Sequence, residues 1–362
     1  MFVAWRDLRF AKGRFALMGS VVLLITLLVG LLSGLTSGLA RENISAVTGL
    51  PASHLAFAAP AGDQKVSFTQ SQLPAGAWKT WRARPGVEAA QPLGIRTTNA
   101  VADGRTAAVS VFGVEPAGRL APAGTGLGRG RVVLTEKAAK ELGGLTAGSR
   151  VRIGTLELTV AAVSGTAAYS HTPVVWADLD DWQRVGNPGT SPEAVATVIA
   201  LEGAGDTDWA AGDEAAGTKT QTVEEALGAI GSYQAENGSL QLMRGFLFAI
   251  SALVIGAFFT VWTIQRSGDI AVLKALGAST PYLLKDALGQ AVVMLGIGTG
   301  AGTALAAGIG VLISGGDVPF VLDAATVLAP AAIMIVLGAL GAALSIRRIT
   351  AVDPLTALGS AR

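Results

Sequence analysis

The chain has 362 residues, of which 51% are hydrophobic and only 15% are charged. A soluble protein of this length usually carries about a quarter charged residues, so the apolar excess indicates membrane-embedded segments. The formal net charge is +1 and no basic tract is present, so nothing indicates a nucleic-acid partner. Cysteine is absent, which excludes disulfides and thiolate metal sites.

The first apolar stretch runs over 15–40 without a charge and is long enough to cross a bilayer, which takes about 20 residues. A cleaved signal peptide is the alternative, because small residues at 38–40 fit a cleavage pattern. The stretch exceeds the length of a signal peptide's apolar region, so we expect a retained span. Gly30, Gly34 and Gly38 repeat every four residues in it, a spacing that lets two membrane helices approach closely. They predict a homodimer seam; packing against the chain's own second span is the alternative.

Residues 41–242 have the composition of a soluble mixed α/β domain. Apolar or alternating runs predict strands at 88–96, 107–114, 150–153 and 156–163. Helical spacing predicts a helix over 135–142, with Thr135 as N-cap and two glycines after it. A second helix, over 222–243, would form a stalk that continues into the second span. The only histidines, His54 and His171, stand in no nucleophile–base pattern, so we expect no enzyme.

Three further apolar stretches follow, at 243–265, 286–314 and 321–346. Basic residues flank the spans at three places: before the first, between the second and third, and after the fourth. The turn between the third and fourth spans has none. Because basic residues stay on the cytoplasmic side, both termini are expected in the cytoplasm and 41–242 outside the cell membrane. The predicted order is cytoplasmic segment 1–14, span 15–40, extracytoplasmic α/β domain 41–242, span 243–265, cytoplasmic helix 266–285, span 286–314, extracytoplasmic turn 315–320, span 321–346 and cytoplasmic tail 347–362.

The segment between the second and third spans predicts a short amphipathic helix. Leu273, Lys274 and Gly277 lie on one face of it, with Asp269 in its first turn and Gly277 as its stop. Taken alone, such a helix could simply lie in the membrane interface.

Its sequence, Arg266-Ser-Gly-Asp-Ile-Ala-Val-Leu-Lys-Ala-Leu-Gly-Ala-Ser, resembles the segment that follows the second span in the MacB/FtsX-type ABC transporter permeases. The opening Trp5-Arg-Asp-Leu-Arg9, the run from Val133-Leu-Thr-Glu136 to Val151 and the tail Arg347-Arg348-Ile-Thr-Ala-Val-Asp-Pro354 are similar too, in the same order. One departure is Asp269, where the family more often has glutamate; the charge is kept.

The resemblance implies a four-helix membrane protein whose short helix couples to a separate ATPase subunit. Two permeases and two ATPases would form the complex, so a homodimer is expected. The chain has no GxxxxGK[ST] loop, so ATP would be bound by the partner. The implied coupling residues are Arg266, Asp269, Leu273, Lys274 and Gly277.

The substrate is inferred from similarity to the haem-exporting permeases of Gram-positive bacteria. Haem would be a transported ligand, with no cofactor bound permanently. Glu42 and Met243, at the outer ends of the first two spans, would meet the iron, and Arg41 and Arg244 would hold the propionates. Tyr233 is a further candidate for the site, and the alternative iron ligands are His54, Tyr169, His171 and Tyr233. The charges could instead be interface anchors.

Two other functions stay open. One is an FtsX-like regulator, whose outer domain activates a cell-wall hydrolase without transport. The other is an exporter of peptides or lipid-linked compounds.

Overall fold

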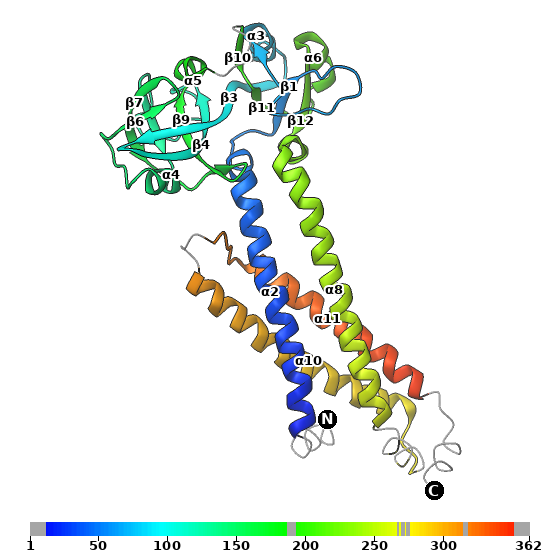
Figure 1. The fold of residues 1–362 in the computed structure, drawn as a ribbon. Coiled ribbons are helices and arrows are strands. Elements are labelled where there is room, and N and C mark those ends of the chain that lie inside the picture. Colours follow the sequence, from blue (N-terminus) through cyan, green and yellow to red (C-terminus); the bar gives the residue numbers. More distant parts are fainter. Residues whose placement is uncertain are drawn as a thin grey trace. The chain divides into compact units, whose positions relative to one another are not determined.

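The computed structural model describes residues 12–186, 193–265, 268, 272, 276–313 and 318–350. The chain forms two compact units (Figure 1). Residues 39–238 form one, here called the inserted domain, and residues 1–38 with 239–362 form the other, here called the membrane unit. Two long helices, α2 (Lys12–Thr48) and α8 (Gly231–Gln265), run from one unit into the other.

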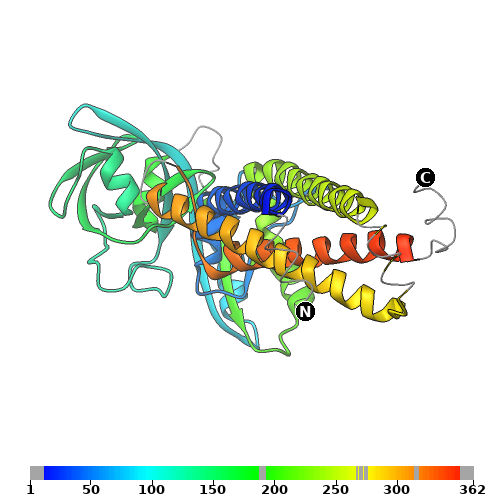
Figure 2. The same ribbon diagram turned by 90° about the horizontal axis from the view of Figure 1, so that it is seen from below.

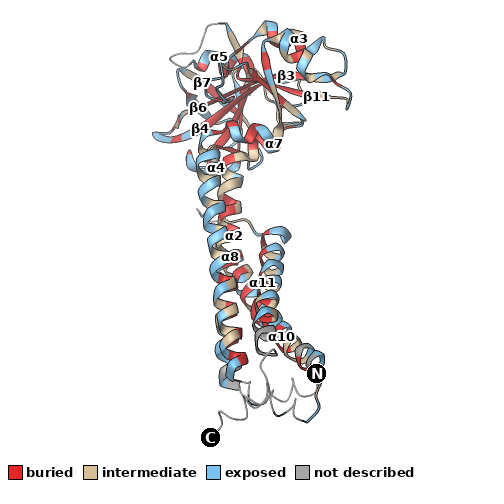
Figure 3. Cartoon of the chain, turned by 90° about the vertical axis from the view of Figure 1, so that its right-hand side faces the viewer, coloured by how far each residue is buried: buried red, intermediate tan, exposed pale blue. Residues whose placement is uncertain are grey.

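The membrane unit consists of α2 and α8 with α10 (Thr280–Ile313) and α11 (Ala324–Thr350). Each contains a stretch long and apolar enough to cross a membrane, yet only 22–33% of the residues in these stretches are buried in the protein (Figure 3). Apolar helices with this little internal cover need lipid around them. The chain is therefore a multi-pass membrane protein, as predicted. The 38–40 cleavage pattern lies inside α2, which continues unbroken to Thr48.

Glycines, which have no side chain, let the membrane helices approach one another closely. Gly298 of α10 lies against Val22 of α2, and Gly302 lies against the backbone of Leu23. Helices α10 and α11 also pack on one another (Figure 2). The core between the helices is apolar and contains Met18, Val22, Val29, Ile255, Phe259, Trp262, Ala291, Met294, Leu295, Met334 and Ala342. Helix association in lipid depends on such close packing, because lipid chains are as apolar as the helices.

Asp323, a charged residue at the start of the fourth apolar stretch, has a structural role at a helix end. Asp323 precedes α11, where its carboxylate accepts a hydrogen bond from the N–H of Thr326 at 2.7 Å. Its carbonyl accepts one from the N–H of Val327 at 3.2 Å. Asp323 therefore caps the first turn of the helix, whose N–H groups otherwise have no partner.

The inserted domain contains a closed six-stranded barrel. Its strands are β3 (Val87–Ala102), β4 (Arg105–Val114), β5 (Arg131–Leu134), β6 (Arg150–Ile153), β7 (Leu156–Val163) and β9 (Thr172–Asp178). They pair in the order β3-β4-β9-β5-β7-β6, and β6 pairs back onto β3 at Ala100 and Val101, which closes the barrel. Short strand β8 (Ala168–Tyr169) pairs with β9, and α4 (Glu136–Glu141) and α5 (Leu179–Val185) cover the barrel.

Two glycines make room for α5 on the barrel. Gly94 of β3 and Gly113 of β4 are cross-strand partners. A Cβ atom at either position would overlap the side chain of Trp182, which is buried. The empty space above this glycine pair therefore seats the largest side chain of α5 against the sheet.

A second sheet extends from the same long strand. β12 (Thr218–Thr222), β1 (His54–Ala58) and β11 (Val198–Gly203) add to the first half of β3. Helices α3 (Ala75–Arg82) and α6 (Trp209–Ala216) pack on this sheet around the buried indole of Trp81. β2 (Leu73–Pro74) and β10 (Ala194–Ala196) form a separate pair.

The end of α2 is anchored in the core of the inserted domain. Ala46, Val47 and Leu50 are buried in one cluster with Phe57 and Ile230. The predicted stalk over 222–243 is wrong at its start, because the structure has α7 (Val223–Ala226), a 3-10 turn (Leu227–Ala229) and an extended Ile230 before α8 begins at Gly231. Ile230 leaves the helical conformation because its side chain is buried in this core.

The predicted fold class, a four-helix membrane protein with an inserted mixed α/β domain, is confirmed. The four predicted strands correspond to β3, β4, β6 and β7. Thr135 is the N-cap residue of α4, although its hydroxyl donates to the carbonyl of Val174 at 2.9 Å and not to the helix. Gly143 and Gly144 follow the helix with φ values of 100° and 81°.

Candidate functional site

The sequence-predicted ligand residues fall in both units. Arg41, Glu42 and Tyr233 belong to the inserted domain, and Met243 and Arg244 belong to the membrane unit. Arg41 is exposed, and Tyr233 is half-buried against the core of the inserted domain. Met243 is 55% exposed, so its thioether is open to a ligand or to lipid. That these five residues surround one crevice stays a prediction.

Two of these charged residues already have partners. The Glu42 carboxylate accepts a hydrogen bond from Nζ of Lys137, on α4, at 2.5 Å. The Arg244 guanidinium donates to the hydroxyl of Ser33, on α2, at 2.5 Å. Arg244 therefore links the first and second spans within the membrane unit, and a propionate would have to share or replace the Ser33 contact.

The side chains of the alternative iron ligands in the inserted domain make other contacts within that domain. Tyr169 lies in the core between the rings of Phe68 and Phe112, and burial raises the pKa of its hydroxyl. His54 stacks on Trp209 at 4.1 Å between ring centroids, and desolvation lowers the pKa of its imidazole. His171 Nε2 lies 2.9 Å from both carboxylate oxygens of Glu236. Among the described residues, no group of three or more acidic or histidine side chains could hold a metal ion.

The three glycines of the predicted seam contact the chain itself. A Cβ atom at Gly30 would meet Ala306 of α10, one at Gly34 would overlap the ring of Phe320, and one at Gly38 would overlap the backbone of Pro319. The carbonyl of Gly34 also accepts a hydrogen bond from the N–H of Val321 at 3.1 Å. This face of α2 is thus used within one chain, by α10 and the segment before α11, not by the second span named as the alternative.

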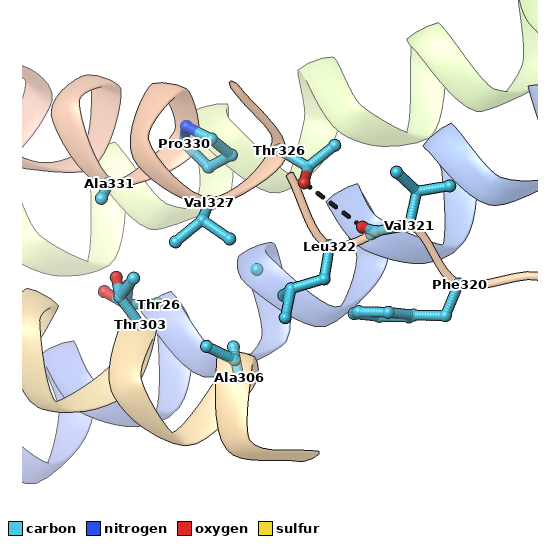
Figure 4. Close-up of a pocket in the computed structure, with 13 residues that line it drawn as sticks. Thr26, Thr303, Ala306, Phe320, Val321, Leu322, Thr326, Val327, Pro330 and Ala331 are labelled. Carbon is cyan, nitrogen blue, oxygen red and sulfur yellow. Dashed lines mark hydrogen bonds between the residues drawn. The ribbon is translucent and has the colours of Figure 1, made fainter. Parts of the chain in front are cut away.

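Figure 4 shows the small cavity beside this contact, where Thr26 and Thr303 lie close together and Phe320 and Leu322 form the opposite wall. The enclosed space is about 10 Å³. A cavity of this size holds no more than one water molecule.

Most of the predicted coupling residues, Arg266, Asp269, Leu273 and Lys274, lie outside the described residues. Gly277 is described, with φ at 95°. The N–H of Leu276 donates to the carbonyl of Val272 at 3.0 Å, which is one helical turn just before this glycine. A left-handed glycine after a helical turn is the usual helix stop, as the sequence predicts for this position.

The structure also brings together a polar cluster that the sequence analysis missed. It joins α2, α8 and the turn between β8 and β9 through Asn43, Ser170, His171, Ser232 and Glu236. Asn43 and Glu236 are 193 positions apart, so no local spacing signals the contact. Asn43 is buried, and buried polar groups need hydrogen-bond partners, but its burial is known only from the structure.

Comparison with known proteins identifies the family. The family described as "MacB-like periplasmic core domain" matches residues 18–218, and "FtsX-like permease C-terminal" matches residues 242–354. A permease of Staphylococcus epidermidis named HrtB, of a hemin transport system, is 27% identical over 99% of both chains. The HrtB permease of Staphylococcus haemolyticus is 25% identical, again over 99% of both chains.

An uncharacterized ABC transporter permease of Mycobacterium tuberculosis is 25% identical over 76% of both chains. Among solved structures, the extracellular domain of the transporter YknZ superposes with a TM-score of 0.35 at 13% identity, covering 47% of this chain and 98% of that one. The periplasmic region of MacB from Actinobacillus actinomycetemcomitans has the same TM-score and identity, covering 51% of this chain and 94% of that one. From the matches to the two family descriptions, the chain belongs to the MacB/FtsX-type ABC transporter permeases.

Proposed function

We propose that the chain is the membrane subunit of a haem efflux pump. In this proposal two copies pair in the cell membrane with both termini in the cytoplasm, and a separate ABC ATPase, also in two copies, binds and hydrolyses ATP. The observation that carries the proposal is the similarity to the HrtB permeases, which extends over 99% of both chains and so includes every span and the inserted domain.

The proposed haem site uses the residues at the ends of α2 and α8. Glu42 and Met243 would approach the iron, Arg41 and Arg244 would pair with the propionates, and Tyr233 would contact the ring. A flat apolar ligand with two carboxylates suits a site between apolar helices bordered by guanidinium groups. The ligand would enter from the outer leaflet, between the two paired copies.

The proposed work cycle depends on the segment 266–280. Two ATPases would close on binding ATP, and the helix around Leu273 would pass that movement to α8. Movement of α8 together with α2 of one copy toward the same helices of the other copy would narrow the site and release haem outward. Hydrolysis would separate the ATPases and reopen it.

The binding site can be tested with the permease–ATPase complex in lipid nanodiscs. We expect haem to bind with a shifted absorbance band, and Glu42→Ala, Met243→Ala and Arg244→Ala to weaken the binding. For Arg244→Ala the loss should be at least about tenfold, because hydrogen bonds to charged groups contribute about 1.5–3 kcal/mol. Glu157→Ala, which removes an exposed carboxylate of β7, is the matched control and should bind haem normally. Unchanged affinity in all three variants would remove the site.

The substrate can be tested by ATP hydrolysis. We expect haem to stimulate the complex, and cells without the permease to be more sensitive to added haem. Stimulation by peptides or lipid-linked compounds but not by haem would instead make the chain an exporter of those. Capture of a cell-wall hydrolase by residues 39–238, together with hydrolysis that no ligand stimulates, would make it an FtsX-like regulator.

A further inference from the structure

The turn between β8 and β9 has an unusual backbone. Tyr169 pairs with Thr172, so Ser170 and His171 form a two-residue hairpin loop. Both are left-handed, with φ values of 50° and 63°. Such loops normally contain Asn-Gly or Gly-Gly, because side chains disfavour this conformation. Serine and histidine stay in it only if contacts outside the turn hold them.

The backbone of the turn is held by α2. The N–H of Ser170 donates to the carbonyl of Asn43 at 2.9 Å, and the N–H of His171 donates to the carbonyl of Glu42 at 3.2 Å. Both carbonyls belong to the part of α2 that has entered the inserted domain. The left-handed conformation is what aims two consecutive N–H groups at the same helix.

The side chains of the turn contact the other helix. The hydroxyl of Ser170 lies 2.8 Å from that of Ser232, and Nε2 of His171 lies 2.9 Å from the carboxylate of Glu236; both partners are in the first turns of α8. The turn thus bonds α2 through its backbone and α8 through its side chains.

Asn43 completes the connection between the two helices. Its side-chain oxygen accepts from the hydroxyl of Ser232 at 2.8 Å, and its amide nitrogen donates to Glu236 at 3.4 Å. Asn43 is only 1% exposed, so these bonds have no water to replace them. The same amide nitrogen lies 3.1 Å from Nε2 of His171. Because the Glu236 carboxylate can only accept, the Nε2–H group of His171 donates to it, and the approach to the Asn43 amide nitrogen is a contact between two donors and not a hydrogen bond.

The His171–Glu236 pair contributes little to the stability of the domain, unlike the buried residues of the core. The two side chains are 30% and 43% exposed, and exposed ion pairs contribute little to stability. Removing the pair should therefore leave the domain folded. What it fixes is the position of the first turns of α8 beside α2.

We propose that Asn43, Ser170, His171, Ser232 and Glu236 form a clasp that makes the first turns of α8 move together with α2 and β9, and that transport requires the clasp to hold. His171 and Glu236 are positioning residues in it. The inference rests on the proposed function, because the movement that the clasp passes on is the one that drives release of the ligand.

The clasp can be tested by distance measurement, because the chain has no cysteine of its own. Spin labels on Thr48→Cys of α2 and Ala235→Cys of α8, both exposed, report the spacing of the helix ends in the full complex. We expect a narrow distance distribution in the labelled parent and a broadened one after His171→Ala or Glu236→Gln. His171→Gln, which keeps an N–H donor, should restore much of the narrow distribution. His54→Ala, at the histidine on Trp209, is the matched control and should change nothing.

The second measurement is ATP hydrolysis by the same complexes. We expect basal hydrolysis to persist in Glu236→Gln, whose side chain is not a candidate haem ligand, and haem stimulation to fall at least about fivefold, the low end of coupling between sites. A distribution that stays narrow in both variants, or full stimulation despite a broadened one, overturns the clasp. If haem fails to stimulate even the parent complex, the proposed function fails, and the distance distributions still decide whether the clasp holds the helices.

Discussion

Nζ of Lys137 donates a hydrogen bond to the carboxylate of Glu42 at 2.5 Å, which ties α4 of the barrel to α2. Both side chains are partly exposed, so the pair contributes little to stability, about 0–1 kcal/mol. It nevertheless competes with any ligand that needs the same carboxylate. A haem iron at Glu42, as proposed, would have to share this carboxylate with Lys137 or displace the lysine.

The competition predicts opposite effects for the two partners. Lys137→Ala should free the carboxylate and strengthen haem binding by up to about fivefold, the most that an exposed pair costs to break. Glu42→Ala should weaken binding. Haem titration of the nanodisc complex measures both, with Lys140→Ala on the same helix as the control. Weaker binding in Lys137→Ala would mean that the ion pair itself shapes the site.

Gly38 offers a test of the close packing in the membrane unit. Gly38→Ala puts a methyl group into the backbone of Pro319, which cannot rotate away as a side chain can. We expect a loss of about 1–3 kcal/mol, the usual cost of overpacking, measured as a lower midpoint of thermal unfolding in detergent. Gly308→Ala on α10, where nothing lies within 4 Å, should be neutral or slightly stabilising.

The same variant addresses the predicted dimer seam. If Gly38 serves packing within one chain, Gly38→Ala should lower the unfolding midpoint. The fraction of the folded protein that chemical cross-linking traps as a dimer should stay unchanged. A normal midpoint with loss of the dimer would place a second copy at this glycine.

The coupling segment can be tested by charge reversal. Lys274→Glu and Leu273→Asp alter the face predicted to contact the ATPase, so we expect the ATPase to be lost from the purified complex. Lys285→Glu, on an exposed position of α10, removes a nearby cation and should leave the complex intact. Haem binding to the permease alone should persist in all three variants. Co-purification of the ATPase with Leu273→Asp would show that another segment holds it.

The stability of the short helix α7, which follows β12, should depend on pH. The pKa of Glu225 is lowered because its carboxylate accepts hydrogen bonds from the N–H and the hydroxyl of Thr222, with a smaller effect of His54. The folded pKa therefore lies below the ordinary value of 4.5, so this stabilisation is present above pH 4.5 and is lost as the pH falls through the folded pKa.

Thr222→Ala removes the hydroxyl that caps α7, where it accepts from the N–H of Glu225 at 3.2 Å. We expect a loss of about 1 kcal/mol at neutral pH, typical of a helix N-cap, and a smaller loss in acid. Thermal unfolding of the full chain between pH 3 and 7 measures this. Thr80→Ala on α3, whose hydroxyl donates to the neutral carbonyl of Gly76 at 3.1 Å, should show no such difference between neutral pH and acid.

The sequence predicts the membrane spans and the strands of the inserted domain well, because both depend on local patterns. Runs of apolar residues mark the spans, and Arg150–Ile153 and Leu156–Val163 have the bounds of β6 and β7. The helix predicted over 222–243 fails at Ile230, where burial in the core overrides helical spacing. A local pattern carries no information about which side chains a distant segment will cover.

The site is harder to predict than the fold. The glycines of the first span signal close approach but not the partners, which in the structure are Ala306, Phe320 and Pro319 and not residues of α8. The polar cluster around Asn43 joins residues from three distant parts of the chain, and the turn that binds them uses Ser170 and His171 where the usual turn residues are absent. Only the folded chain brings these groups together.

Strand β3 has a consequence for how the inserted domain can be cut or exchanged. Its first half is hydrogen-bonded to β11 and its second half to β4, so one uninterrupted strand belongs to both sheets. A break near its middle would leave each sheet with an exposed edge and an incomplete core. The barrel and the second sheet therefore cannot be separated as independent modules. A chimaera with a related permease should transfer residues 39–238 whole, joined within the helices at each end.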